Sequence, residues 1–366
     1  MEKPSTSACI KKAQVPISCH FCNGNRINWK CEECDAIMCN SCKDKIHDRI
    51  KSTKDHEVLS FDNVGDDPSA STEVSSEVIS SIFNSYTTTV PVHSLFCTDD
   101  DLVYIISAKL NSKGQGQLIK GKMLKASIRT MMSLAEPIFD IVVNKNGEVL
   151  FTQLITATES PIRMLLSSGE IKTVLDPKPM RLLALHLNKD DELVCSLREL
   201  GSPFPLHDFS VRQVVIFGSD YKRKMTFEFD SNGKRLFTYP SRIRTDSNNV
   251  IYIIDWLNMN TGRIVAMERN GRLKFTFCGP IDFEYFQPSS IVVTPNDNIV
   301  VCDHHNNALL ALNSKGSLIA VQFVHEMNIS SIFALCIDSE GFLLIGCSEN
   351  DSESGKIHAV KMTETI

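Results

Sequence analysis

The chain has 366 residues, 42% of them hydrophobic and 22% charged, a composition typical of soluble globular proteins. This length suits two or three domains, each large enough to bury a core without disulfide bonds. Lys and Arg number 38 against 44 Asp and Glu, and the net charge of −6 gives no support to binding of a nucleic-acid backbone. The chain has neither an apolar run of about 18 residues nor a signal-peptide pattern, so we expect a cytoplasmic protein without membrane contacts.

Cysteine is distributed unevenly along the chain. Seven of the 13 cysteines fall between Cys9 and Cys42, and the other six are scattered from Cys97 to Cys347. Because an intracellular chain keeps its thiols reduced, a dense cluster indicates a metal site before a disulfide framework. We therefore expect a disordered polar tail over residues 1–16 and a small metal-binding domain over residues 17–60.

The cluster holds three Cys-x2-Cys pairs followed by two histidines. Its eight candidate ligands are Cys19, Cys22, Cys31, Cys34, Cys39, Cys42, His47 and His56. Eight sulfur and nitrogen ligands fill two tetrahedral Zn2+ sites and leave no open position for a catalytic water. The short spacer from Cys34 to Cys39 favours interleaving, in which the first and third pairs hold one ion and the second pair holds the other with the histidines. A disulfide knot and redox-active thiols are the alternatives.

Residues 61–88 differ in composition from the segments on either side. They contain no Lys or Arg, five acidic residues and many serines, which predicts a flexible acidic linker. Residues 77–83 could form a short helix within it. The segment is too short for a long coiled coil.

Residues 89–366 repeat a unit of strand, polar turn and strand. Examples are the segments 141–151, 185–195, 243–252, 291–301 and 335–344, with a weaker copy at 95–104. Their turns start near residues 98, 144, 188, 245, 294 and 338, and the longest interval contains the loop 201–205. A period of about 45 residues with several short strands predicts an all-β fold, a β-propeller of six blades. Seven blades, a pair of β-sandwiches and a β-solenoid are the alternatives.

The spacing from Cys19 to His56 resembles a B-box zinc finger, nearer to its type-1 form. This resemblance implies two zinc ions bound in the cross-brace arrangement of RING domains. Two predicted blades resemble NHL repeats, through Asp303 with the asparagines that follow it and through Asp255 with Arg263. A B-box followed by such a propeller is similar to the tripartite-motif (TRIM) proteins that end in NHL repeats.

Two features of that family have no counterpart in the sequence. The residues before Cys19 hold no RING domain, and the linker holds no coiled coil. We therefore expect a non-catalytic scaffold that binds protein partners, in ubiquitin-related or signalling regulation. A ubiquitin ligase acting through the RING-like B-box and an RNA-binding regulator are the alternatives, and the oligomeric state stays open.

Each of the other polar and aromatic clusters in the repeats has a functional interpretation and a purely structural one. Asp303, His304 and His305 could bind a metal but are typical of a polar turn. The basic run 222–224 could touch RNA but favours a solvated turn. Trp256, Tyr285 and Phe286 could line a peptide groove or pack between blades. No nucleophile, phosphate-loop or paired-carboxylate motif is present, so we predict no catalytic residue.

Overall fold

The computed structural model divides the chain into two compact units, residues 1–73 and 74–366. It describes residues 29–31, 36–38, 40–45, 47, 56, 58–60, 74–98, 100–107, 116–125, 127–135, 138–153, 160–231, 233–348 and 354–366. Within this described part of the chain, no helix is both long and apolar enough to cross a membrane.

The first unit contains a small sheet and a short helix. Strand β1 (Trp29–Cys31) lies between β2 (Ala36–Met38) and β3 (Val58–Ser60), and α1 (Asn40–Lys45) connects the sheet to the segment that contains His47. Cys31 pairs with Ala36 on one side and with Val58 on the other. Among the described residues of this unit, Cys31 and Met38 are fully buried, and Trp29 and Val58 pack against them.

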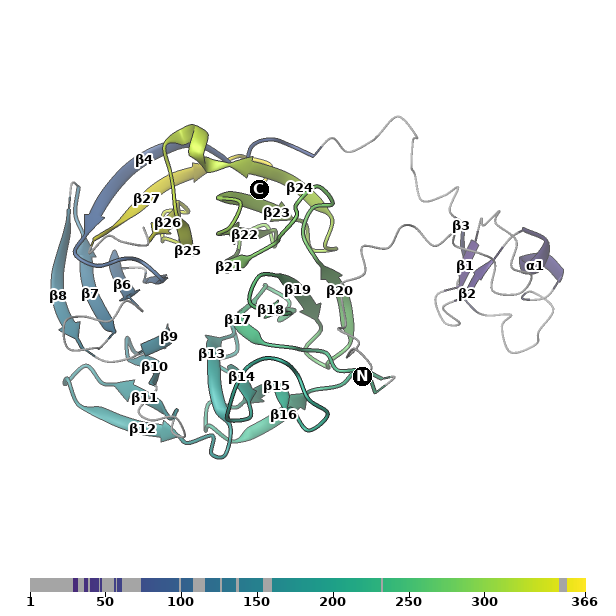
Figure 1. Ribbon diagram of the computed structural model, residues 1–366, viewed down its shortest axis with the longest axis horizontal. Coiled ribbons are helices and arrows are strands. Elements are labelled where there is room, and N and C mark those ends of the chain that lie inside the picture. Colours follow the sequence, from purple (N-terminus) through teal and green to yellow (C-terminus); the bar gives the residue numbers. More distant parts are fainter. Residues whose placement is uncertain are drawn as a thin grey trace, which may run out of the picture. The chain divides into compact units, whose positions relative to one another are not determined.

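The second unit is a six-bladed β-propeller (Figure 1), as the repeats predicted. Each blade is an antiparallel four-stranded sheet, and its first strand lies next to the central axis. The first three blades comprise β5 (Ser94–Cys97), β6 (Leu102–Ser107), β7 (Gln117–Met123) and β8 (Ile128–Leu134); β9 (Ile138–Val143), β10 (Val149–Gln153), β11 (Ile162–Leu165) and β12 (Ile171–Leu175); and β13 (Arg181–Leu187), β14 (Leu193–Arg198), β15 (Arg212–Phe217) and β16 (Arg223–Phe227).

The other three blades complete the ring. They comprise β17 (Pro240–Thr245), β18 (Ile251–Trp256), β19 (Gly262–Met267) and β20 (Leu273–Phe277); β21 (Pro288–Val293), β22 (Ile299–Asp303), β23 (Ala308–Leu312) and β24 (Leu318–Phe323); and β25 (Ile332–Ile337), β26 (Leu343–Cys347), β27 (Gly355–Met362) and β4 (Ile79–Thr88). A 3-10 helix, η3 (Val324–Met327), follows β24. The blades are numbered 1 to 6 in this order.

Alternating strand directions give the propeller two different faces. The turns between the first and second strands, such as residues 188–192 and 294–298, lie on what we call the turn face. The opposite face, the loop face, carries residues 199–211, 257–261, 278–287 and 324–331, where inner strands begin and second strands end. The connection 199–211 is the predicted loop insertion, and it accounts for the longest repeat interval.

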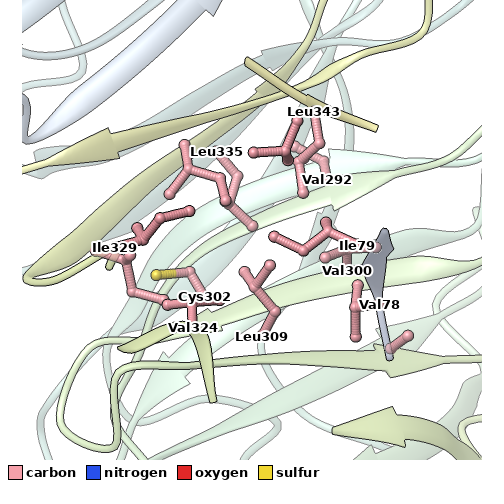
Figure 2. Close-up of a cluster of buried hydrophobic side chains, with 14 of the residues drawn as sticks. Val78, Ile79, Val292, Val300, Cys302, Leu309, Val324, Ile329, Leu335 and Leu343 are labelled. Atoms are coloured by element: carbon pink, nitrogen blue, oxygen red, sulfur yellow. The ribbon is translucent and has the colours of Figure 1, made fainter. Parts of the chain in front are cut away.

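Buried side chains fill each of the six interfaces between neighbouring blades. Strand β18 illustrates the pattern, because Ile251 and Ile253 pack against blade 3 while Tyr252 and Ile254 pack against blade 5. Such two-sided burial explains why the strands have nearly continuous apolar sequences instead of a polar alternation. Figure 2 shows the cluster between blades 5 and 6, which includes Val300 and Leu335.

Strand β4 closes the ring, and this corrects the predicted helix and the predicted end of the linker. Residues 79–83 are the first part of strand β4, which pairs with β27 from Ile79 opposite Met362 to Thr88 opposite Gly355. Ser75 already bridges Ala320, through Ser75 N to Ile319 O and Val321 N to Ser75 O, both 2.9 Å. The propeller unit therefore begins at Val74 and not at residue 89. As the outermost strand, β4 exposes most of its side chains, which is why its sequence is as polar as that of a linker.

Candidate functional site

Three of the predicted metal ligands come together in the first unit. The ligand atoms of Cys31, His47 and His56 all lie within 4.8 Å of one another. The distance from Cys31 Sγ to His56 Nδ1 is 3.6 Å, and the two imidazole rings are 5.9 Å apart at 58°. In the described residues this is the one group of three or more Cys, His, Asp or Glu side chains with such geometry.

The local fold explains how residues distant in sequence converge here. Cys31 ends the central strand β1, His47 follows α1, and His56 lies two residues before Val58, the partner of Cys31 in β3. Cys31 and His47 are fully buried and His56 is half-buried. Lys43 of α1 places its ammonium 4.7 Å from the centre of the Trp29 ring, which holds the helix over the sheet.

The donor set and its spacing fit a tetrahedral zinc ion. Zinc bonds of about 2.0–2.1 Å to nitrogen and 2.3 Å to sulfur place ligand atoms of a tetrahedral site about 3.3–3.8 Å apart. The measured separation of Cys31 Sγ and His56 Nδ1 falls within that interval. A fourth ligand would complete the site, and Cys34 is the residue that the sequence assigned to it.

Four of the eight predicted ligands belong to the described part of the chain. Cys42, buried on α1, is not part of the group around Cys31, and the interleaved arrangement assigned it to the other ion. Cys19, Cys22, Cys34 and Cys39 lie outside the described residues.

The candidate metal site in blade 5 has the contacts of a polar turn. The buried Asp303 carboxylate accepts hydrogen bonds from Gln287 N at 3.3 Å and from Asn306 N at 3.2 Å and Nδ2 at 2.7 Å. His304 Nδ1 is 2.9 Å from Ile332 O, and His305 packs edge-on against Tyr285. These side chains hold backbone segments of the loop face together.

Asp255 of blade 4, which corresponds to Asp303, also holds backbone segments together, and it is paired with an arginine. Asp255 is fully buried, accepts hydrogen bonds from the backbone amides of Thr238 and Tyr239 at 2.8 and 2.7 Å, and pairs with Arg263 at 2.8 Å. Burial raises the pKa of Asp255, and Arg263 opposes that shift. Asp255 and Arg263 thus fix the chain segment that leads into inner strand β17.

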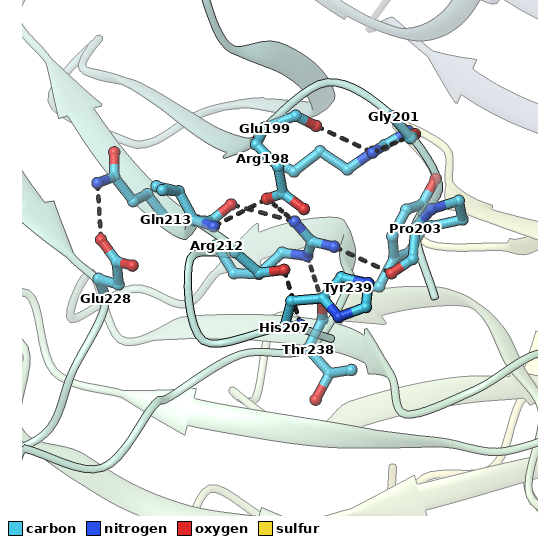
Figure 3. A network of polar contacts seen from close by, with 12 residues as sticks. Arg198, Glu199, Gly201, Pro203, His207, Arg212, Gln213, Glu228, Thr238 and Tyr239 are labelled. Atoms are coloured by element: carbon cyan, nitrogen blue, oxygen red, sulfur yellow. Dashed lines mark hydrogen bonds and ion pairs between the residues drawn. The ribbon is translucent and has the colours of Figure 1, made fainter. Parts of the chain in front are cut away.

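Arg212 anchors the insertion of blade 3, as Figure 3 shows. It forms an ion pair with Glu199 and donates to Pro203 O at 2.9 Å and to Thr238 O at 2.6 Å. Burial lowers the pKa of Arg212 to about 10. Because the three acceptors belong to two different loops, Arg212 ties residues 199–211 to the connection between blades 3 and 4.

The basic run 222–224 lies on the turn face and is salt-bridged. Lys222 pairs with Asp220 at 3.2 Å, and Lys224 pairs with the buried Glu192 at 3.1 Å. Glu192 also pairs with Arg269 at 2.5 Å, and this hydrogen bond is the main reason why its pKa falls from 4.5 to about 2. The run therefore serves as the expected solvated turn, with Lys224 linking neighbouring strands.

A polar cleft of about 680 Å³ lies on the turn face beside this network. Arg269 and Lys274 line it together with Asp246, Glu268 and Asp297. The carboxylates already accept hydrogen bonds, for example from Tyr252 Oη to Asp246 at 2.9 Å. Arg269 pairs with Glu192, and Glu268 pairs with Arg272, so the cleft presents side-chain charges of both signs.

The aromatic residues singled out in the sequence divide between packing and surface. Phe286 is buried between blades 4 and 5, and Trp256 is half-buried against the same cluster. Tyr285 contacts His305 on the loop face.

Comparison with known proteins supports the propeller fold and assigns neither a family nor a function. No family model and no curated protein matches the chain. Among solved structures, virginiamycin B lyase from Staphylococcus aureus aligns over 76% of this chain and 99% of its own, with 12% identity and a TM-score of 0.52. A putative oxidoreductase (glucose dehydrogenase) from Thermus thermophilus aligns over 75% and 98%, with 12% identity and a TM-score of 0.50. At such identity the likeness shows a shared fold alone.

Proposed function

We propose that this chain is a zinc-binding scaffold that joins two protein-interaction modules, a B-box-like finger and a six-bladed propeller. In the finger, Cys31, Cys34, His47 and His56 hold one ion. Cys19, Cys22, Cys39 and Cys42 hold the second. The convergence of Cys31, His47 and His56 carries the proposal, since three such donors this close together are expected to share an ion.

The small size of the first unit explains what zinc contributes. Its described apolar core contains only Cys31 and Met38 as fully buried side chains, with Trp29 and Val58 around them. A domain of about 40 residues can bury few apolar side chains and seldom folds on a hydrophobic core alone. Zinc bound by the cysteines and histidines would supply that free energy, so its role is structural and not catalytic.

The protein-binding role draws on the organisation of the chain. Two compact modules on one chain can bind a partner together, because the first contact raises the effective concentration of the second. Ligase activity and RNA binding have no comparable support in the contacts above and stay predictions.

Metal analysis of the purified full chain tests the zinc sites. We expect two zinc ions per chain, and one ion after His56→Ala or Cys31→Ala. His305→Ala removes an exposed histidine of the propeller and serves as the control that keeps both ions. Fewer than one ion in the unsubstituted chain would refute the assignment.

Thermal unfolding of the same variants tests the two-module organisation. Because the units are separately compact, loss of an ion from the first unit should leave the cooperative transition of the propeller unchanged. Affinity capture with each unit as a separate bait then shows which module binds protein. If His56→Ala abolishes both transitions together, the modules are not independent and the scaffold proposal fails.

A further inference from the structure

The insertion of blade 3 is the longest connection between a second and a third strand in the ring. It runs from residue 199 to residue 211 on the loop face, between β14 and β15. A surface connection of this length is ordinarily mobile, because few hydrogen bonds hold its backbone. The contacts of this insertion are different.

Three arginines hold the insertion by its backbone carbonyls, at distances of 2.7–2.9 Å. The pairs are Arg198 with Glu199 O and Gly201 O, Arg212 with Pro203 O, and Arg235 with Asp208 O. Figure 3 shows the first two of these arginines. The path of the insertion is therefore fixed within the folded propeller, so a partner that binds it does not have to order it and little conformational entropy is lost.

The fixed insertion presents an aromatic ring at its tip. Phe209 is 79% exposed, and its ring stacks on that of His207 at 5.2 Å and 14°. His207 N donates to Ser210 Oγ and Ser210 N donates to His207 O, both at 3.0 Å. These two hydrogen bonds close the turn that carries Phe209, and Ser210 is buried beneath it.

A second exposed ring lies beside the first. Phe229, in the connection from β16 to β17, is 48% exposed. The Arg235 guanidinium lies 5.1 Å from the centre of the Phe229 ring and also binds Asp208 O, next to Phe209. We call His207, Phe209 and Phe229 the aromatic tip. A single exposed ring needs no explanation, but neighbouring exposed rings indicate an interaction surface.

The charges around the aromatic tip leave one carboxylate without a counter-ion. Residues 199–211 contain no Lys or Arg, and Asp208 is exposed and forms no salt bridge with a described residue. The other charges of the two connections stand beside an opposite charge: Glu199 with Arg212, Glu228 with Arg235, and Asp230 with Lys234 in one turn. A free carboxylate beside exposed rings repels a nucleic-acid backbone. It complements a protein surface that has a cation beside apolar groups.

We infer that the aromatic tip docks into an apolar pocket of a partner protein, with a Lys or Arg of that partner paired with Asp208. Aromatic side chains that enter such pockets commonly carry most of the binding energy of an interface. The anchored backbone of the insertion presents Phe209 in one place before the partner arrives. This inference rests on the proposed protein-binding function and adds the loop, the anchoring residues and the chemistry of the partner.

The test uses a phage library of small three-helix domains randomised on one face, with the full chain as bait. Affinities of the enriched domains are measured by biolayer interferometry. We expect their selected faces to carry Lys or Arg beside apolar residues. Phe209→Ala should weaken binding by about tenfold or more. Phe83→Ala removes the same side chain from β4, where it is 67% exposed, and should leave binding unchanged.

Two further measurements separate docking from folding and identify the ion pair. Phe209→Ala truncates a mostly exposed side chain, so its Tm should equal that of the unsubstituted chain. Asp208→Asn should weaken binding by about threefold or more at low ionic strength, and this difference should vanish at about 1 M salt. A difference that persists at high salt would contradict the pairing of Asp208 with a partner cation.

The remaining outcomes would overturn the inference. Failure to enrich any domain, enriched faces that lack basic residues, or domains that bind Phe209→Ala normally would show that the aromatic tip is not a docking site. Single-stranded oligouridine that binds in a Phe209-dependent manner would replace the protein partner with nucleic acid. Zinc content and unfolding of the His56→Ala variant test the scaffold independently of all these results.

Discussion

Closure of the ring by β4 can be tested with two fragments that differ only in where they begin. The fragment 74–366 retains β4 and the bridge from Ser75 to Ala320, whereas 89–366 begins where the sequence alone placed the propeller. In the shorter fragment, β27 loses its outer partner and becomes an exposed edge. We expect 74–366 to fold as a monomer and 89–366 to be unstable and prone to aggregation.

The expected magnitude follows from the side chains that the deleted segment buries. Val78 and Ile79 are 0% and 1% exposed within the cluster between blades 5 and 6, and Tyr86 is 7% exposed between blades 6 and 1. Burial of each contributes about 1.5–3 kcal/mol, or about 5–9 kcal/mol together. This sum is comparable to the total stability of about 5–15 kcal/mol of a typical domain.

Urea unfolding followed by tryptophan fluorescence measures the difference, because Trp256 lies within the propeller. The full chain serves as the reference, and 74–366 should reproduce its midpoint for the propeller transition. If 89–366 is soluble and unfolds at the same midpoint and with the same slope as 74–366, closure by β4 does not stabilise the ring. The reasoning from burial would then be wrong.

Two buried carboxylates give further predictions for stability. The hydrogen bond from Arg269, together with that from Lys224, lowers the pKa of Glu192 from 4.5 to about 2. The stability it confers should therefore be complete above pH 4.5 and lost as the pH falls toward 2, and Glu192→Gln should cost about 1.5–3 kcal/mol at pH 6 and much less at pH 2. Equal losses at both pH values, measured by urea unfolding, would contradict this assignment. Asp255→Asn leaves Arg263 without its buried partner and should cost about 3 kcal/mol, whereas an unchanged midpoint in the same assay would show that the pair is not stabilising.

The blades were predictable because their signals are local. Each polar turn needs particular residues, such as Asn249 and Asp297, which adopt positive φ values in the turns of blades 4 and 5. Each turn is flanked by strands buried on both sides, so the apolar runs recur at a regular interval. The same local logic places Cys31, His47 and His56 in one motif by spacing alone.

The features that sequence inspection missed depend on contacts between distant segments. Strand β4 pairs with β27, whose Gly355 lies opposite Thr88. No pattern within residues 74–88 indicates that they pair with a strand so distant in sequence. The exposed outer position of β4 favours polar side chains, so composition indicated a linker.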